Sequence, residues 1–417
     1  MRAFGRSYQR LYLAAVGSRF GDSARTSAIA VLAAQLTSSP AVLSWVSAMS
    51  FAPWLLFGLP AGALVDRVDK RRAFLWADGA RCLLLVVLTT LAFAGQLTIP
   101  WLIVCAFALT SAQTMADSCF TGMLPTVVDN DQLGPANARL SASQSTAQVA
   151  GPPTGSALAA LGAGWPFLLN ALTFGASAAW VSSLPTDTGR RPHTDGSDAE
   201  PRQAGWRRLR ADIAEGVRRV RARPPLPLLL GGVAVSNLCN GLNSAVLPLL
   251  ATRELGVSMA SYGFLIGANA ASMVAGNLTA GAGLKRGVAD HTLATAAIAV
   301  KIPGFALVCL APSFAALLVG MAVLGLGAGM WNVPSSTLMM RSAPPEVLGR
   351  TNALFRTVAV AGMPLGAVLG GAVATLWGLR ASAATAGALT VLLLIYFIRR
   401  IRAPKVVTGA PAVSWRP

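Results

Sequence analysis

The sequence predicts an all-α membrane protein with twelve transmembrane helices, arranged as two six-helix bundles related by pseudo-symmetry. Three observations lead to this fold class: the composition, a succession of long apolar segments, and one polar interruption in the middle of the chain. Of the 417 residues, 54% are hydrophobic and only 12% are charged, and the mean hydropathy is +0.57. Soluble domains carry about 25% charged residues, and a soluble protein of this size could not remove so much apolar surface from water. Lipid is therefore expected to surround much of the chain.

The apolar segments set the number of spans, since a helix needs about 20 mainly apolar residues to cross a bilayer. The predicted spans are 11–36, 42–65, 73–94, 98–122, 136–160, 165–184, 226–250, 259–282, 292–311, 314–340, 352–376 and 382–398. The connections are short except for one polar stretch. The predicted organisation is an N-terminal bundle (1–184), a cytoplasmic linker (185–225), a C-terminal bundle (226–398) and a cytoplasmic tail (399–417).

The linker itself changes character along its length. Its first half is polar and reads as a flexible segment. In its second half apolar residues recur at helical spacing among many arginines, at Trp206, Leu209, Ile213, Val217 and Val220. This pattern predicts an amphipathic helix lying on the inner membrane surface, with a solvated basic linker as the alternative.

The net charge of +18 is distributed unevenly. About 26 of the lysines and arginines fall in segments that would share one side of the membrane, whereas Arg253 and Arg380 alone fall in loops on the other side. This is the positive-inside pattern, and it predicts that both termini are cytoplasmic. A nucleic-acid-binding protein would need a soluble basic face instead, so that class is disfavoured. Arginine far outnumbers lysine, and alanine, glycine and proline are abundant, a usage that suggests a high-GC bacterium. The expected location is the bacterial inner membrane.

Nothing in the sequence predicts a metal, a cofactor or enzymatic chemistry. The five cysteines all lie in apolar runs without metal-ligand spacing, and both histidines fall in predicted cytoplasmic loops. No phosphate-binding loop of the G-x-x-x-x-G-K-[ST] type is present in the sequence, which disfavours direct use of ATP. We expect a monomer whose substrate is a small molecule.

Two short motifs recur in the same order about 215 residues apart, as expected of two equivalent halves. They are Leu133-Gly134-x-x-Asn137-Ala138 with Leu348-Gly349-x-x-Asn352-Ala353, and Gly151-x-Pro153-x-Gly155 with Gly362-x-Pro364-x-Gly366. The alternative is a chance match in a chain rich in glycine and alanine.

The loop between spans two and three carries the most specific motif. It reads Gly62-Ala63-Leu64-Val65-Asp66-Arg67-Val68-Asp69-Lys70-Arg71-Arg72. This resembles the signature loop of the major facilitator superfamily, G-x-x-x-D-R/K-x-G-R/K-R/K, and departs from it at Asp69, where the family usually has glycine. The resemblance implies a twelve-helix transporter in which this loop latches the outward-facing state.

The residues of this loop also have a physical interpretation. Gly58 and Gly62 share one helix face, so a neighbouring backbone can approach closely. Asp66 favours the positive N-terminal end of another helix, and Arg67, Lys70 and Arg71 can pair with carboxylates when the inner side is shut. The alternative is a simple positive-inside stop signal.

The Leu133/Asn137 loop, the span-five motif Gly151-Pro152-x-x-Gly155 and the basic central loop resemble the bacterial branch that contains the enterobactin exporter and macrolide-efflux proteins. The span-five motif also partly matches that of drug/proton antiporters, although Ser143, Ala147 and Ser156 stand where that motif has glycine. The resemblance implies efflux, as in drug resistance. Gly151, Pro152 and Gly155 are expected to let span five bend and slide, with a plain packing kink as the alternative.

Charged residues inside the spans need partners or water, because a charge at the bilayer centre costs about 2.5–3.5 kcal/mol. Arg19, Asp22 and Arg25 lie three residues apart on span one, and Asp78 and Arg81 repeat this spacing on span three. Asp117 lies on span four, which has no lysine or arginine. Further cations lie on spans five, nine and eleven, at Arg139, Lys301 and Arg356. We expect intramembrane ion pairs among Arg19, Arg25, Asp78, Arg81, Arg139 and Arg356.

The carboxylates are also the proton carriers that the sequence offers. Burial and neighbouring cations act in opposite directions on carboxylate protonation, so alternating exposure can load and release a proton. Asp22 or Asp117 is expected to couple proton entry to transport, whereas Asp78 and Arg81 are expected to be structural partners of the signature loop. Fixed ion pairs are the alternative for all of them.

The resemblance implies a central cavity lined by spans one, four, seven and ten. The residues expected to contact substrate there are Gln113, Asn237, Asn240, Trp331 and Asn332. Amides and an aromatic suit an amphipathic organic molecule, although interhelical hydrogen bonds are the competing role for each asparagine. The expected function is therefore proton-coupled export of a small amphipathic compound by an antiporter, with an uptake permease or a lipid flippase as alternatives.

Overall fold

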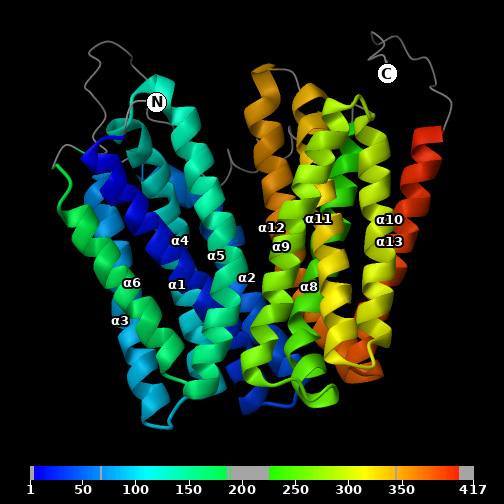
Figure 1. Cartoon of the computed structure of the whole chain (residues 1–417), viewed down its shortest axis with the longest axis horizontal. Coiled ribbons are helices and arrows are strands. Elements are labelled where there is room, and N and C mark those ends of the chain that lie inside the picture. Colours follow the sequence, from blue (N-terminus) through cyan, green and yellow to red (C-terminus); the bar gives the residue numbers. More distant parts are fainter. Residues whose placement is uncertain (1–3, 66–67, 186–187, 189–224, 343–344, 403–417) are drawn as a thin grey trace. The chain divides into compact units, whose positions relative to one another are not determined.

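The computed structural model describes residues 4–65, 68–185, 188, 225–342 and 345–402 (Figure 1). This part of the chain forms long α-helices joined by short connections. The helices are α1 (Arg6–Leu36), α2 (Pro40–Val65), α3 (Lys70–Phe93), α4 (Ile99–Val127), α5 (Leu133–Leu161), α6 (Trp165–Ser182), α8 (Pro225–Leu249), α9 (Met259–Lys285), α10 (Asp290–Leu310), α11 (Phe314–Ser342), α12 (Pro345–Trp377) and α13 (Leu379–Arg402). Two short segments, the 3-10 helix η1 (Asn130–Gln132) and the π-helix η2 (Leu250–Glu254), lie between them. Each predicted span corresponds to one of these twelve described helices, which confirms the fold class.

Eight of the described helices are long and apolar enough to cross a membrane by themselves. The less apolar ones are α1, α5, α6 and α9. In α1 the reason is the charged triplet Arg19, Asp22 and Arg25; in α5 and α9 it is an abundance of glycine, alanine and polar residues. Such helices depend on neighbouring helices to satisfy their polar groups. The amphipathic helix predicted around Trp206 lies outside the described residues, as does the tail from residue 403.

The chain divides into two compact units, Met1–Arg210 with Ser244–Gly267, and Ala211–Asn243 with Ala268–Pro417. In the first unit α1 packs against α5 and α6, while α3 packs against α4 and α6, and α2 against α4. Its core includes Tyr8, Leu11, Phe74, Cys119 and Met123. Helix α1 is therefore packed between neighbouring helices, and its charged residues lie against them.

In the second unit α10 packs against α11 and α13, and α12 packs against α13. The core here includes Ile298, Trp331 and Phe397, and the two aromatic rings meet edge to face with centroids 5.7 Å apart. At one end of this unit Arg341 Nη1 lies 2.9 Å from Asp290 Oδ2, which ties α11 to the start of α10.

The repeated Gly-x-Pro-x-Gly motif makes the same contact in both units. Gly155 of α5 lies against the backbone of Ala24 in α1, and a side chain at Gly155 would overlap that backbone. In the same way Gly366 of α12 lies against the backbone of Leu238 in α8. Glycine is required at both places because the helix backbones touch. The repeat seen in the sequence is therefore a structural repeat, in which α1 and α5 correspond to α8 and α12.

Candidate functional site

Asp22 of α1 is the centre of a buried network of charges in the first unit. Its Oδ1 lies 3.3 Å from Arg25 Nη2 and its Oδ2 lies 3.6 Å from Arg81 Nη1 of α3. Both guanidinium groups are buried, with side-chain exposures of 6% and 4%. The sequence predicts cations on either side of Asp22 along α1, but the second cation is Arg81 rather than Arg19. A residue on a packed neighbouring helix thus lies as close to Asp22 as one three residues away on the same helix.

The side chain of Asp78 is fully buried and has partners on two helices. It forms the predicted ion pair with Arg81 on its own helix, and Ser177 Oγ of α6 donates a hydrogen bond to Asp78 Oδ2 at 2.6 Å. The Arg81 guanidinium also lies over the ring of Phe174, with Cζ 4.0 Å from the ring centroid. Arg81 thus joins two carboxylates and an aromatic face, which together offset the cost of burying its charge.

Helix α6 supplies a further contact to Asp22. Asn170 Nδ2 donates to Asp22 Oδ1 at 3.4 Å, and Thr173 Oγ1 donates to Asn170 Oδ1 at 3.1 Å. This approach depends on Gly21, because a Cβ at that position would overlap the side chains of Asn170 and Thr173. The glycine before Asp22 therefore lets the amide of α6 reach the carboxylate.

Arg19 takes a different partner from the one the sequence predicts. Its Nη2 lies 2.6 Å from Asp117 Oδ1 of α4, and both side chains are partly open, with exposures of 32% and 24%. Asp117 has no cation on its own helix, so its partner comes from a helix about 100 residues earlier in the chain. The pair differs from the Asp22 and Asp78 pairs in its access to solvent.

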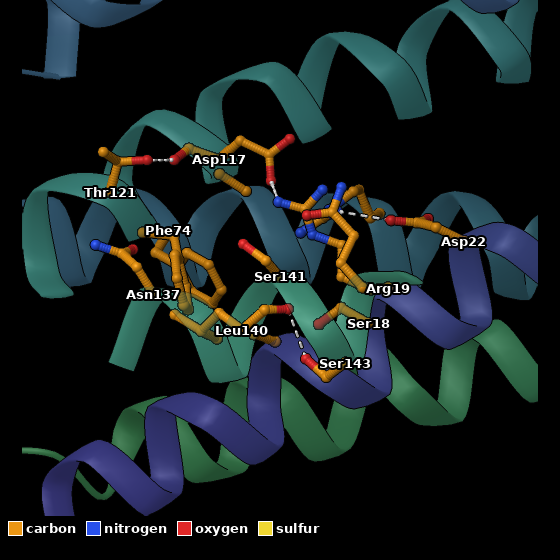
Figure 2. A pocket seen from close by; sticks show the side chains of 15 residues that line it. Ser18, Arg19, Asp22, Phe74, Asp117, Thr121, Asn137, Leu140, Ser141 and Ser143 are labelled. Atoms are coloured by element: carbon orange, nitrogen blue, oxygen red, sulfur yellow. Dashed lines mark hydrogen bonds and ion pairs between the residues drawn. The ribbon is translucent and has the colours of Figure 1, made fainter. Parts of the chain in front are cut away.

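A cavity of about 210 Å³ opens beside these pairs, between α1, α3, α4 and α5. Arg19 and Asp22 reach its wall from α1 and Asp117 reaches it from α4 (Figure 2). Helix α5 contributes Asn137, Ser141 and Gln144, which share one helix face. The lining is completed by Ala15, Ser18, Phe74, Arg81, Ala116, Phe120, Thr121, Leu140 and Ser143. The cavity therefore combines a partly open ion pair with hydroxyl, amide and aromatic groups.

The charges around this cavity balance. Arg19, Arg25 and Arg81 face Asp22, Asp78 and Asp117, so three cations meet three carboxylates. A neutral cluster of this kind avoids the cost of a lone charge within the span. Changing the protonation of any member would leave one unbalanced charge.

The described residues of the signature loop stabilise the ends of two helices, α3 and α6. Asp69 caps the start of α3 by accepting a hydrogen bond from the backbone of Arg72 at 3.0 Å, which explains an acidic residue where the family usually has glycine. Arg71 donates to the carbonyls of Val181 and Ser182 at the end of α6, at 3.2 and 2.5 Å. A cation there also suits the negative end of the helix.

Two further positions of the signature motif, Lys70 and Gly58, differ in how closely they are packed. The aliphatic part of Lys70 packs on Gly122 of α4. A Cβ added at Gly58 would meet no atom within 4 Å among the described residues, so the expected close approach of a backbone is not seen there. Asp66 and Arg67, together with the surroundings of Gly62, lie outside the described residues, and the latch stays a prediction.

The predicted ion pairs of Arg139 and Arg356 are not found among the described residues. Both side chains are exposed. Arg139 lies over the ring of Tyr12, with Cζ 4.6 Å from the centroid, and near Phe4 at 5.9 Å. For Arg139, this exposed cation–π contact takes the place of the expected carboxylate partner.

The predicted substrate contacts fall in different environments. Gln113 lies on α4 one turn before Asp117 and is half-buried. Asn237 donates to the carbonyl of Val233 on its own helix at 2.9 Å, and Asn240 is half-buried. In the second unit Trp331 packs on Gly232 and Phe397 in the core, whereas Asn332 is exposed. The position of Trp331 favours a packing role over substrate contact.

Several site residues carry a sequence signal that was not used. Asn170, Phe174 and Ser177 follow one face of the otherwise apolar α6, and all three contact the charge network. A polar stripe at this spacing within an apolar helix indicates partners on a neighbouring helix. Asn137 belongs to one of the repeated motifs and also lies in the cavity wall.

Comparison with known proteins places this fold in a family. The family model described as "Major Facilitator Superfamily" matches residues 11–286 and 229–417. The chain belongs to the major facilitator superfamily. It is thus a multi-pass membrane protein of this superfamily. Uncharacterized MFS-type transporters of Mycobacterium tuberculosis and Mycobacterium bovis are each 28% identical over 269 residues, which cover 58% of this chain and 56% of the relative. The match thus spans little more than half the length of these curated relatives.

Solved structures of several transporters share the fold. A bacterial homologue of the iron transporter ferroportin, in its inward-facing state, superimposes with a TM-score of 0.76 at 13% identity, covering 96% of this chain and all of the other. The nucleoside transporter NupG gives 0.73 at 12% identity, covering 95% and 100%. A bacterial homologue of the lysosomal transporter Spinster gives 0.73 at 15% identity, covering 97% and 98%. At such identities the likeness concerns the fold, and the substrate has to be argued from the site.

Proposed function

We propose that this transporter is a proton-coupled exporter of a small amphipathic compound, such as a drug, siderophore or secondary metabolite, working by alternating access. The observation that carries this proposal is the Arg19–Asp117 pair in the wall of the cavity, partly open to solvent. A carboxylate that meets both a cation and a water-accessible space can exchange a proton when the surrounding helices move. The resemblance to bacterial efflux proteins supports the outward direction.

Asp117 is better suited than Asp22 to carry the proton. Protonating Asp22 would leave Arg25 and Arg81 with excess charge at positions that are almost fully buried. Protonating Asp117 would leave the excess charge on Arg19, whose side chain is 32% exposed. Because water stabilises a charge far better than the protein interior does, the second change costs less. Asp22 then serves as a fixed ion pair.

The cavity lining supports an amphipathic substrate. Asn137, Ser141 and Gln144 offer uncharged hydrogen-bonding groups on one wall, and Phe74 and Phe120 offer aromatic surface. A substrate cation could displace Arg19 from Asp117, which would couple substrate binding to the protonation of the same carboxylate. Export would then exchange one cation for one proton at this site.

The proposal is tested in energised inside-out membrane vesicles with the amphipathic cationic dye ethidium as probe. We expect the wild-type protein to accumulate the dye when a proton gradient is imposed. Asp117→Asn should lower this accumulation about tenfold or more, while dye still equilibrates down its own gradient. Asp131→Asn removes an exposed carboxylate outside the network and is the matched control.

Three outcomes would contradict the proposal. Undiminished proton-driven accumulation in both Asp22→Asn and Asp117→Asn would remove the coupling role of these carboxylates. Accumulation of the dye in right-side-out vesicles instead would indicate an uptake permease. Movement of a labelled phospholipid in proteoliposomes without movement of the dye would indicate a flippase.

A further inference from the structure

The second unit contains a buried cation that has no carboxylate partner among the described residues. Lys301 lies near the middle of α10, its exposure is 4%, and its Nζ donates a hydrogen bond to Ser236 Oγ of α8 at 3.3 Å. Either end of α10 is about 15 Å away, which is farther than a lysine side chain can reach to place its charge in water. An ammonium group has three donors, and a hydroxyl satisfies one of them without supplying charge.

The structural repeat shows that Lys301 occupies a place equivalent to that of Arg81. Asp22 stands two residues before Ala24, the residue of α1 against which Gly155 packs, and Ser236 stands two residues before Leu238, the residue of α8 against which Gly366 packs. In the first unit the residue at this place, Asp22, pairs with the cation on α3. In the second unit the equivalent residue is Ser236, and it contacts the cation on α10.

The second carboxylate of the network is also replaced. Asp78 precedes Arg81 by three residues, whereas Ile298 precedes Lys301 by three residues and lies in the apolar core. The second unit therefore has a cation at this place without either of the two counter-charges found in the first unit. The cation also differs between the units: the first has arginine, which stays charged in proteins, and the second has lysine, which can lose its proton when buried.

The groups that face Lys301 do not supply a charge. From α8 come Ser236, whose hydroxyl accepts a hydrogen bond from the amine, and Cys239, whose thiol accepts one from Thr390 Oγ1 of α13. From α11 comes Gly327, where an added Cβ would lie 2.7 Å from Lys301 Cγ. Of these neighbours, Cys239 carries the titratable side chain.

We propose that Lys301 is a proton-binding site of the second unit, neutral while it is enclosed between α8, α10 and α11, and protonated when water reaches it. The bond that forms is N–H on the amine, and the proton comes from water entering on one side and leaves to water on the other. In transport, which rests on the function proposed above, this site would add a second titrating group to that of Asp117.

The first test is independent of any substrate. The thermal unfolding of the purified full chain in detergent is measured between pH 6 and pH 10 for the wild type and for Lys301→Met. Because the unfolded chain binds a proton that the enclosed amine does not, lowering the pH should destabilise the wild type relative to Lys301→Met. The ratio of their unfolding equilibrium constants should change by up to about tenfold per pH unit. Lys285→Met, at an exposed lysine, should show no such trend.

A second variant rebuilds the arrangement of the first unit. Ser236→Asp should give Lys301 a counter-charge, hold the amine protonated, and remove the pH trend. A difference between wild type and Lys301→Met that does not vary with pH would overturn the proposal. A pH trend unchanged by Ser236→Asp would overturn it as well.

The role in transport is read from Lys301→Arg, which keeps the charge but cannot release a proton. We expect this variant to reach the membrane in normal amounts. Its proton-driven accumulation of ethidium should be reduced about tenfold. Wild-type accumulation by Lys301→Arg would overturn the role of proton release in transport. If the wild type itself fails to move the dye, the exporter proposal fails for this probe, and the unfolding experiment still decides whether Lys301 binds a proton.

Discussion

At the scale of single residues, Arg81 determines the character of the charge network. It contacts Asp22 and Asp78 with its guanidinium edge and Phe174 with its face, so one side chain connects α1, α3 and α6. A planar group with several donors is suited to this bridging in a way that lysine is not. Removing a carboxylate from such a network leaves a buried charge without compensation, which is the costly change.

Asp78→Ala is accordingly expected to lower the free energy of unfolding by about 3–5 kcal/mol. The side chain of Asp78 is fully buried, and its loss leaves the buried Arg25 and Arg81 to share Asp22 and leaves Ser177 without its acceptor. The measurement is the unfolding transition of the purified protein in detergent. Arg72→Ala is the control: its 3.9 Å pair with Asp69 is exposed, and its loss should cost less than about 1 kcal/mol. Similar losses for both variants would show that burial does not set the value of these pairs.

At the scale of helices, the contact between α1 and α5 combines close packing with helix-breaking residues. Gly151 and Gly155 bring α5 onto Ser23 and Ala24, and the Pro152 carbonyl accepts a hydrogen bond from Ser27 Oγ at 2.8 Å. Proline in a helix interior removes backbone hydrogen bonds, and the Ser27 hydroxyl ties this part of α5 to α1. The same interface carries Arg19 and Asp22 toward the cavity, so any movement of α5 along α1 would reach the site directly.

Gly155→Val is expected to destabilise the protein by about 1–3 kcal/mol or more, because the added side chain would overlap the backbone of Ala24. Gly366→Val should have the same effect through Leu238 in the second unit. Gly175→Val is the control, since nothing lies within 4 Å of an added Cβ at that position of α6. The three variants are compared by their apparent melting temperatures in detergent. Equal melting temperatures for Gly155→Val and Gly175→Val would argue against the close helix contact.

At the scale of the whole molecule, twelve spans and the uneven charge predict which connections share a side of the membrane. The connection between α3 and α4 should lie outside and that between α9 and α10 inside, because an odd number of spans separates them. Gln96 and Val288 are exposed positions in these two connections.

Single cysteines at Gln96 and Val288, in a chain without its native cysteines, test this arrangement. A membrane-impermeant thiol reagent added to intact cells should label the first at least tenfold more than the second. Permeabilised cells, in which both should react, provide the control. Equal labelling in intact cells would contradict the predicted topology and, with it, the assignment of cytoplasmic termini.

The helices of this protein and their order can be predicted from the amino-acid sequence. Apolar length is a local property of the chain, and each of the predicted spans became one described helix. Close spacing also predicted correctly that Asp78 pairs with Arg81 and Asp22 with Arg25, because residues three apart on a helix are neighbours. The repeated glycines were visible for the same reason, as short motifs that need no knowledge of the fold.

The tertiary structure alone decided which charges meet across helices. Asp117 pairs with Arg19 and Arg81 reaches Asp22, although nothing in their spacing distinguishes these partners from others. It also left Lys301 beside a serine, in the place where the first unit has a carboxylate. Such contacts depend on the rotation and packing of whole helices, which are set by the sum of many side-chain contacts and not by any one segment of the chain.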